Sequence, residues 1–276
     1  MNEPAPTAPR QGPSELKLRV LSALVLAALV LLATIWGGWP FRLLWILVAG
    51  VVAYEWLAIV SRSNAIAVGI AVAVAGLALT FSSASPAALA GTAAAAALLG
   101  ALATPFLRSR LGLELCGVAY ALAFALITPA LRDLPGIGLA LILWSFAVVW
   151  LTDIGAYFTG RKFGGPKLMP SVSPKKTWSG AIGGAAAGML GGYLVWRLSP
   201  SMGALSAAGP IVAASLAGSI VSQAGDLFES ALKRRFDTKD SSNLIPGHGG
   251  FLDRLDGYWA VLVLAGLALF AIHLNI

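Results

Sequence analysis

The sequence has few charged residues and almost no cysteine or histidine. Only 11% of its 276 residues are charged, whereas 58% are hydrophobic, and the mean hydropathy is +0.82. A soluble domain carries about 25% charged residues, so this composition excludes an ordinary soluble enzyme and predicts an integral membrane protein. The single cysteine, Cys116, excludes an intramolecular disulfide and a cysteine-based metal cluster.

Acidic residues are also scarce, because 12 Asp and Glu face 19 Lys and Arg, which gives a formal net charge of +7. A nucleic-acid-binding protein would gather its basic residues along one polar face, but here they lie in short segments between apolar runs. We therefore expect no nucleic acid partner. Anionic lipid and nucleotide phosphates are the expected partners of these segments.

Apolar runs recur along the chain at the length of about 17–25 residues that crosses a bilayer. We predict an all-α, polytopic integral membrane protein with about nine transmembrane helices. The predicted spans are residues 20–36, 40–60, 65–82, 87–104, 115–131, 136–158, 179–197, 208–232 and 255–275. Between residues 65 and 104 the predicted helices are rich in Ala and Gly, which provide little hydrophobic free energy for insertion into the bilayer. A count of eight or ten spans is therefore the alternative.

The runs divide the chain into three parts. Residues 1–14 are rich in Pro and Ala without periodicity and predict a disordered cytoplasmic tail. Residues 15–135 form the N-terminal transmembrane helices, and residues 136–276 form a catalytic transmembrane region with two basic cytoplasmic loops. With the N-terminus in the cytoplasm and alternating spans, the Lys and Arg residues outside the cytoplasm are only Arg42, Arg132 and Arg197. The positive-inside rule thus supports both the orientation and the count.

Half of the acidic residues gather at the end of one predicted span and in the loop before the last one. Asp226 and Glu229 lie at the end of a span, where a carboxylate costs roughly 2.5–3.5 kcal/mol on insertion scales and needs a polar cavity, a basic partner or a metal. Ser222 and Ser230 lie four residues on either side of Asp226 and would add oxygen atoms that suit Mg²⁺. The alternative is an acid at a helix end that snorkels to the interface or forms a salt bridge, with Lys233 as the candidate partner.

A second acidic cluster, Asp253 and Asp256, flanks Arg254 just before the last span. In a helical turn, this three-residue spacing places both carboxylates on one face. Because the last two spans form a cytoplasmic hairpin, this cluster can meet Asp226 at one membrane depth and share one or two cations with it. The alternative for Asp256 is that it only favours the start of a helix.

The first basic loop contains a Ser-Pro-Lys-Lys-Thr-Trp segment. Ser173 is suited to cap a helix and Pro174 to begin it. Lys175 and Lys176 would then lie in the first turn, where the helix dipole disfavours positive charge. A bound phosphate would relieve that conflict. Lysines that are present only because the loop is cytoplasmic are the alternative.

The second basic loop contains a Pro-Gly-His-Gly-Gly segment that is too rich in Gly and Pro to continue a helix. Gly249 and Gly250 permit close approach of the backbone to a ligand, while His248 can contact phosphate or base, or simply close a turn. Glu55 and Asp153 are further polar groups inside predicted spans. The sequence assigns no role to either of them.

Two motifs together resemble the signature of the phosphatidate cytidylyltransferases, also called CDP-diacylglycerol synthases. They are Ser230-x2-Lys233-Arg234-x4-Lys239-Asp240 and Pro246-x-His248-Gly249-Gly250-x2-Asp253-Arg254-x-Asp256. The segments 173–178 and 225–230 also resemble that family, so the resemblance covers about residues 140–270. Ser179 departs from the family pattern, in which Glu usually follows the tryptophan.

The resemblance implies a reaction in which a phosphatidate oxygen attacks the α-phosphorus of CTP, releasing pyrophosphate and leaving CDP-diacylglycerol. It implies Mg²⁺ at Asp226 and Asp253, with a second cation as an open alternative, and a homodimer. By their positions, Asp256 and Glu229 would be further metal ligands or groups that orient the ligands, and we count Asp256 among the ligands. We expect the protein in a bacterial inner membrane, with its active site facing the cytoplasm.

Residue roles follow from the motifs and from the charge of the two substrates. The catalytic candidates are Asp226, Asp253, Asp256, Lys233 and Arg254. The candidates for binding CTP and the phosphatidate headgroup are Ser173, Lys175, Lys176, Thr177, Arg234, Lys239, His248, Gly249 and Gly250.

Three other functions compete with this interpretation. A CTP-dependent lipid kinase would release CDP instead of pyrophosphate. A CDP-alcohol phosphatidyltransferase resembles an Asp-Gly-x2-Ala-Arg pattern, which Asp256 and Gly257 begin but the following residues do not continue. A transporter would use Glu55, Asp153 and Asp226 as a relay, but the charged residues gather at one membrane face and no clear inverted repeat is seen.

Overall fold

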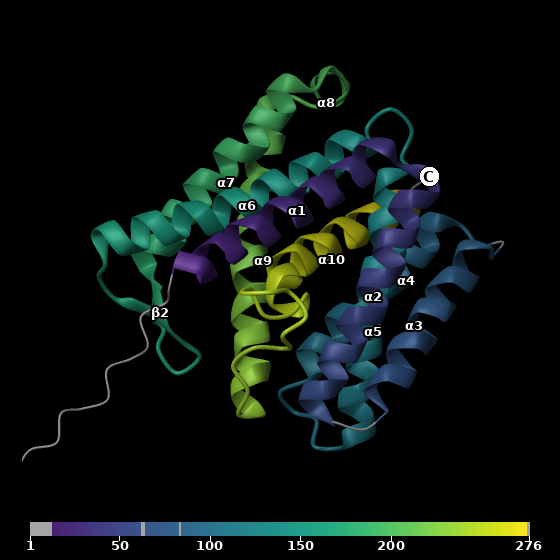
Figure 1. Cartoon of the computed structure of the whole chain (residues 1–276). Helices are drawn as coiled ribbons and strands as arrows, with labels where there is room; N and C mark the ends of the chain where they lie inside the picture. The colour runs from purple at the N-terminus through teal and green to yellow at the C-terminus, as the bar shows by residue number, and fades with distance from the viewer. Residues whose placement is uncertain (1–12, 62–63, 83, 275–276) are drawn as a thin grey trace, which may run out of the picture.

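The computed structural model describes residues 13–61, 64–82 and 84–274, which are mostly helical (Figure 1). The helices are α1 (Pro13–Trp36), α2 (Gly38–Val60), α3 (Ala65–Thr80), α4 (Pro86–Ala103), α5 (Arg110–Arg132), α6 (Gly138–Phe163), α7 (Trp178–Leu198), α8 (Pro200–Leu205), α9 (Ala208–Arg235) and α10 (Leu252–Leu274). Each predicted span coincides with one long helix in this part of the chain. Residues 1–12 of the predicted tail (residues 1–14) lie outside the described part of the chain, and residues 13 and 14 belong to α1.

Seven helices of the described chain are long and apolar enough to cross a membrane, namely α1, α2, α4, α5, α6, α9 and α10. The helix α3 is apolar but shorter, and α7 contains six glycines. The prediction of a polytopic integral membrane protein is therefore confirmed. The count of nine spans and the cytoplasmic N-terminus stay predictions.

The structure departs from the predicted all-α fold in a hairpin of β1 (Lys167–Met169) and β2 (Ser173–Thr177), which pair antiparallel. The predicted helix start at Ser173 is wrong. Thr177 caps α7 instead, because its Oγ1 accepts a hydrogen bond from the Gly180 N–H at 3.1 Å. Lys175 and Lys176 therefore lie in a strand and not in the first helical turn, so the expected conflict with the helix dipole does not arise.

An aromatic core joins α10 to the N-terminal helices. The Trp45 ring on α2 stacks on Phe124 of α5 and on Tyr258 of α10, with ring centroids 5.9 and 5.2 Å apart. Tyr120 on α5 stacks on Trp259 of α10 at 4.2 Å. Such buried aromatic pairs add stability beyond the area that they bury. The first turn of α10, which carries the second acidic cluster, is therefore held against the N-terminal half.

Glycines bring α7 against α6 along much of its length. A Cβ added to Gly184 would lie 2.8 Å from the Thr152 carbonyl oxygen, and one added to Gly191 would lie 2.9 Å from that of Ala147. Only glycine permits this backbone approach, which is the usual packing of small residues between membrane helices. It leaves α6 and α7 as one wall beside α9.

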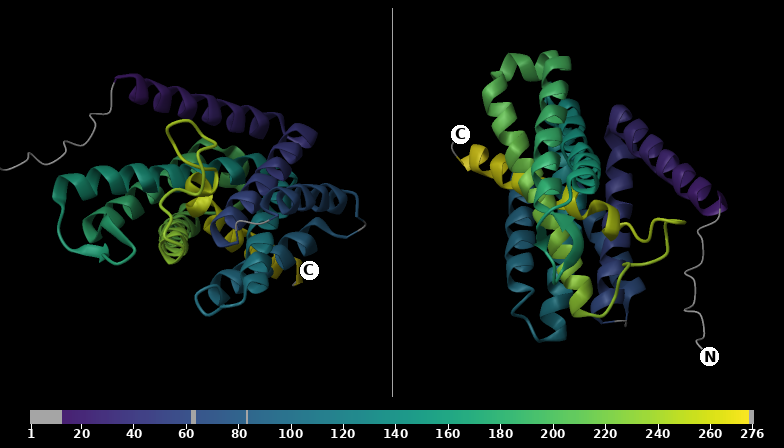
Figure 2. Two further views of the ribbon diagram at one scale, coloured as in Figure 1. Left: turned by 60° about the horizontal axis from the view of Figure 1, so that its bottom comes forward. Right: turned by 90° about the vertical axis from the view of Figure 1, so that its left-hand side faces the viewer.

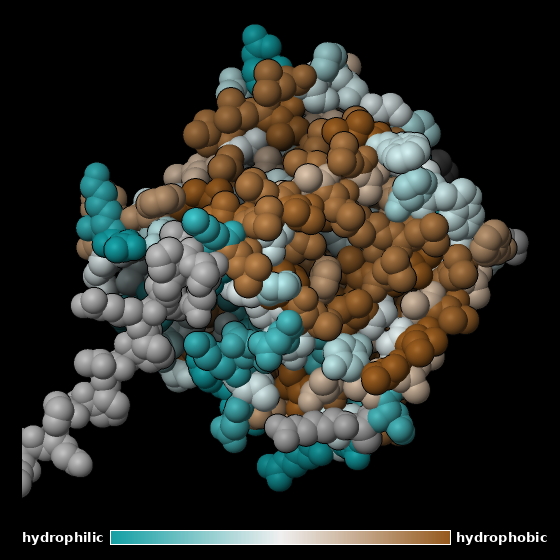
Figure 3. All heavy atoms as spheres, viewed as in Figure 1, coloured by the Kyte–Doolittle hydropathy of each residue, from teal (hydrophilic) through white to brown (hydrophobic). Residues whose placement is uncertain are grey.

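The outer surface is mostly apolar, as expected in a bilayer. The views in Figure 2 show α1 lying along one side of the molecule, and only 6% of its apolar window is buried. On the face shown in Figure 3, hydrophobic residues cover the centre and right, while hydrophilic residues gather toward the lower left. An apolar surface of this extent requires lipid around it.

Candidate active site

A cavity of about 690 Å³ lies between α6, the β-hairpin, α7, α9 and the start of α10. Its acidic lining residues are Asp153, Asp226, Glu229, Asp240, Asp253 and Asp256. Its basic lining residues are Arg161, Lys175, Lys176, Lys233 and Arg254. So many charges in one cavity of a chain with 11% charged residues mark a candidate functional site.

The structure brings together most of the residues that the sequence singled out. All five catalytic candidates line the cavity, and so do Lys175, Lys176 and Thr177. The remaining substrate-binding candidates are not among the lining residues, namely Ser173, Arg234, Lys239, His248, Gly249 and Gly250. The last three lie in the loop behind the wall of the cavity, where they shape the backbone around Asp253.

Asp226 on α9 pairs with the ammonium group of Lys176 on β2, and both side chains are partly exposed, at 35% and 27%. Asp226 thus forms a salt bridge, as the alternative interpretation expects, but its partner is Lys176 and not Lys233, which pairs with Glu229 and Asp253. Ser230 Oγ donates to Asp226 Oδ1 at 3.4 Å, as its four-residue spacing predicts. The buried Ser222 hydroxyl has no hydrogen-bond partner among the described residues.

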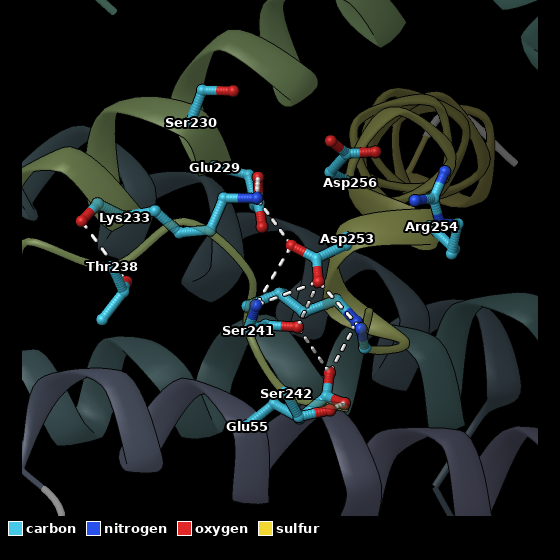
Figure 4. Close-up of polar contacts among 12 residues, drawn as sticks. Glu55, Glu229, Ser230, Lys233, Thr238, Ser241, Ser242, Asp253, Arg254 and Asp256 are labelled. Atoms are coloured by element: carbon cyan, nitrogen blue, oxygen red, sulfur yellow. Dashed lines mark hydrogen bonds and ion pairs between the residues drawn. The ribbon is translucent and has the colours of Figure 1, made fainter. Parts of the chain in front are cut away.

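Lys233 on α9 bridges two carboxylates deep in the site (Figure 4). Its Nζ lies 2.7 Å from Glu229 Oε2 and 2.6 Å from Asp253 Oδ1, and the three side chains are only 13%, 3% and 6% exposed. Removing one member of such a buried ion pair leaves an uncompensated charge in a poorly solvated place. The three residues therefore depend on one another.

The two oxygens of Asp253 face different surroundings. Oδ2 accepts hydrogen bonds from Ser241 N at 2.9 Å, Ser241 Oγ at 2.9 Å and Gly250 N at 2.8 Å. Oδ1 accepts from Lys233 at 2.6 Å and has a longer contact with Ser241 N at 3.2 Å. Gly249 has a φ of +84°, and a Cβ there would lie 2.7 Å from Oδ2. The loop thus anchors Oδ2 and leaves Oδ1 toward Lys233.

Asp256 lies one turn after Asp253 on α10, and Figure 4 shows its carboxylate turned toward α9. Its Oδ1 accepts a hydrogen bond from the Gly257 N–H at 2.7 Å. Asp256 is not merely at the helix start, because α10 begins four residues earlier, at Leu252. The predicted shared face of the two carboxylates agrees with the cavity that both of them line.

One wall of the cavity is formed by residues to which the sequence assigned no role in the proposed reaction. Asp153, Tyr157 and Arg161 line the cavity from α6, and Arg161 Nη1 donates to the Tyr157 hydroxyl at 2.8 Å. These residues are spaced four apart, which places them on one helix face. That spacing, at the end of a span that carries an acid, is the signal that could have found them.

The carboxylates of the cavity are suited to a metal ion only together with other ligands. Among the described residues, no group of three or more His, Cys, Asp or Glu side chains forms a metal site by itself. Asp226 and Asp253 each direct one oxygen to a lysine ammonium group, so each presents an oxygen to a cation. Mg²⁺ usually takes one or two protein carboxylates and completes its shell with phosphates and water. The residues fit Mg²⁺ that arrives with a phosphate substrate.

Comparisons with known proteins cover nearly the whole chain. The model of the cytidylyltransferase family matches residues 17–272. The phosphatidate cytidylyltransferase of Brucella suis is 43% identical over 264 residues, which are 94% of this chain and 95% of that protein. The phosphatidate cytidylyltransferases of Haemophilus influenzae and Staphylococcus aureus are 45% and 42% identical over 124 and 129 residues, or 44% and 46% of this chain and 43% and 48% of theirs. The chain therefore belongs to the cytidylyltransferase family.

Proposed function

We propose that this protein transfers the cytidylyl group of CTP to phosphatidic acid, giving CDP-diacylglycerol and pyrophosphate. The observation that carries the proposal is a cavity rich in both carboxylates and lysines, between apolar helices, in a chain that aligns over nearly its full length with a phosphatidate cytidylyltransferase. A charged cavity at this position can receive a water-soluble nucleotide while the acyl chains of the lipid stay in the bilayer.

In the proposed reaction, a phosphatidate oxygen forms a bond to the α-phosphorus of CTP, and the bond from that phosphorus to the bridging oxygen breaks. The electron pair leaves with pyrophosphate. The phosphatidate phosphate is already ionised near neutral pH, so the step needs no general base. Catalysis then depends on positioning the two phosphates and neutralising their charge.

The basic residues of the cavity are suited to hold the nucleotide phosphates. Lys175 and Lys176 reach the cavity from β2, and Arg161 reaches it from α6. Lys176 now pairs with Asp226 at a partly exposed position, where a phosphate can compete for its ammonium group. Arg254, at the start of α10, is suited to contact a second phosphate.

Mg²⁺, when bound, would neutralise charge on the nucleotide phosphates. Asp226, Asp253 and Asp256 are the side chains that we propose to hold it, with Asp253 offering Oδ1. A second cation in the same cavity is the alternative that the family resemblance leaves open. Glu229 is suited to orient Lys233, and through it Asp253, rather than to bind the cation, because its carboxylate is buried against that lysine.

The location and orientation of the protein are proposed from the basic residues of its loops. We propose a bacterial inner-membrane location with the cavity on the cytoplasmic side, because the basic loops lie around the cavity and CTP is cytoplasmic. We also propose that the protein works as a homodimer, as the family resemblance implies.

One assay tests the proposed function directly. Purified protein in detergent is incubated with CTP, phosphatidate and Mg²⁺, and both pyrophosphate and nucleotide-bearing lipid are measured. Equal amounts of the two products are expected, together with loss of turnover when Mg²⁺ is chelated. Release of CDP with no nucleotide-bearing lipid would instead indicate a CTP-dependent lipid kinase, and ion flux in liposomes without CTP would indicate a transporter.

A further inference from the structure

Glu55 is a completely buried carboxylate inside α2, outside the cavity that the proposed reaction uses. Its Oε1 accepts hydrogen bonds from Ser242 Oγ at 2.6 Å and Phe251 N at 3.0 Å. Its Oε2 accepts from Leu252 N at 2.7 Å and Ser241 Oγ at 3.2 Å. All four donors belong to the loop between α9 and α10 or to the start of α10 (Figure 4). A residue of the N-terminal half thus holds the loop of the catalytic half.

Part of this arrangement is helix capping from a distance. The first N–H groups of a helix have no acceptor within the helix, and a negative charge is favourable at that end. Glu55 supplies that charge to the Phe251 and Leu252 N–H groups. It therefore fixes where α10 begins, one residue before Asp253.

Ser241 connects Glu55 to Asp253. The single hydroxyl proton of Ser241 is shared between Glu55 Oε2 at 3.2 Å and Asp253 Oδ2 at 2.9 Å, and the Ser241 N–H also donates to Asp253. Gly250 fills the space between them, because a Cβ there would lie 2.1 Å from Ser241 Oγ and 2.4 Å from Glu55 Oε1. The chain of contacts runs from α2 to Asp253 and on to Lys233.

We infer that Glu55 is a positioning residue for cytidylyl transfer. Through Ser241 and the start of α10, it fixes Asp253 so that Oδ2 is engaged by the loop and Oδ1 is presented to Lys233 and the cavity. This inference rests on the proposed function, since it assigns Glu55 a part in that reaction. Groups that orient a ligand or catalytic carboxylate typically change activity by about 10- to 100-fold when they are replaced.

The substitution Glu55→Gln tests this geometry because it keeps the shape and changes the hydrogen bonding. Each oxygen of Glu55 accepts from one backbone N–H, so the NH₂ group of glutamine meets an N–H donor whichever way it lies. The start of α10 must then shift. We expect kcat to fall by about 10- to 100-fold, with a smaller change in the KM for CTP. A variant with the kcat of the wild type would overturn the inference.

Neighbouring serines provide a matched pair of variants that keep Glu55. Ser241 and Ser242 both donate to Glu55, but only Ser241 also contacts Asp253. We expect Ser241→Ala to lower kcat by about 10-fold and Ser242→Ala by no more than about 2-fold, at similar thermal stability. Adding Glu55→Gln to Ser241→Ala should reduce kcat less than the two single effects predict, because both act through one chain of contacts. Equal effects of the two serine variants would show a merely structural role.

Amide hydrogen exchange gives a readout that does not depend on activity. In Glu55→Gln, the amides of Ser241, Gly250 and Leu252 should exchange faster, whereas those of the aromatic core on α5 should not change. Unchanged exchange at these three amides would contradict the inference. If the wild-type protein made no nucleotide-bearing lipid, the proposed function would fail, and the exchange experiment would still decide whether Glu55 holds Asp253.

Discussion

The cavity contains two lysine–carboxylate pairs with the same chemistry and very different surroundings. Lys176 and Asp226 come from a hairpin strand and a helix, and both remain partly exposed. Lys233 and Asp253 are nearly buried, and Glu229, Ser241 and Gly250 engage them further. The Lys176–Asp226 pair can exchange partners with an incoming phosphate or cation. Asp253 is instead held to the loop through Oδ2, and only its Oδ1 faces Lys233 and an incoming cation. One side of the cavity, at Lys176 and Asp226, can therefore change its contacts when substrate binds, whereas the side at Asp253 is fixed by the loop.

The sharpest way to separate the two pairs is to neutralise each carboxylate. Asp226→Asn should lower turnover by about 10³-fold or more, because a cation that neutralises phosphate charge is worth several kcal/mol. Its thermal stability should hardly change, since the pair with Lys176 is partly exposed. Turnover assays and thermal unfolding in detergent measure both quantities, and full activity in Asp226→Asn would refute the metal assignment.

Asp253→Asn should also abolish turnover, but here stability should fall as well. The amide of asparagine would replace an oxygen that now accepts either from Lys233 or from the loop backbone, and a buried donor would lose its partner. Thermal unfolding compares the two asparagine variants. A melting temperature as high as that of Asp226→Asn would contradict the anchored role of Asp253.

Replacing Lys233 or Lys176 compares the two ion pairs by the free energy of unfolding alone. Lys233→Met leaves Glu229 and Asp253 without a buried counter-charge and should destabilise the protein by about 3–5 kcal/mol. Lys176→Met should cost no more than about 1 kcal/mol, because its pair is solvated. Unfolding experiments in detergent that gave equal losses would show that burial does not distinguish the two pairs.

A smaller effect is expected from filling the space beside the anchored pair. Gly250→Ala places a methyl group against Ser241 and Glu55 and should destabilise the protein by about 1–3 kcal/mol. Gly209→Ala is the matched control, because a Cβ there meets nothing within 4 Å. The difference in melting temperature between the two variants measures the effect, and it should be accompanied by lower kcat only in Gly250→Ala.

The smallest effect concerns the outer side of the loop. Burial and then the nearby Arg254 lower the pKa of His248, whose Nδ1 lies 2.9 Å from Ser22 Oγ on α1. As pH falls, the unfolded chain takes up this proton before the folded protein does, so the folded state loses stability. When the pH is lowered from about 7.5 to 5.5, the melting temperature of the wild type should therefore fall further than that of His248→Gln. An identical loss in both proteins would contradict this assignment.

Much of this arrangement could be predicted from the sequence. Hydropathy located the long helices, and the three acids that the sequence grouped, Asp226, Asp253 and Asp256, line one cavity. Their roles in catalysis and metal binding stay predictions. The motif at residues 173–178 misled, since Ser-Pro signals both a helix start and an extended segment, and Thr177 made the better cap. Local spacing identified the acids and the Ser230 partner of Asp226, but not the lysines that pair with Asp226 and Asp253.

The role of Glu55 lay beyond sequence reasoning for a physical reason. Its partner Ser241 is 186 residues away, and the contact depends on how the aromatic core sets α10 against α2 and α5. Nothing in the local pattern around Glu55 reports that packing. A buried acid in a span indicates a partner, but only the fold shows which one.

A structure of the protein with CTP and Mg²⁺ bound tests most directly whether the Lys176–Asp226 pair opens while the loop contacts of Asp253 persist. We expect Lys176 to leave Asp226 for the triphosphate while Asp226 binds the cation. We also expect Ser241 and Gly250 still to donate to Asp253 Oδ2, and Glu55 still to accept from the start of α10. An intact Lys176–Asp226 pair beside bound nucleotide, or a loop released from Asp253, would contradict these expectations.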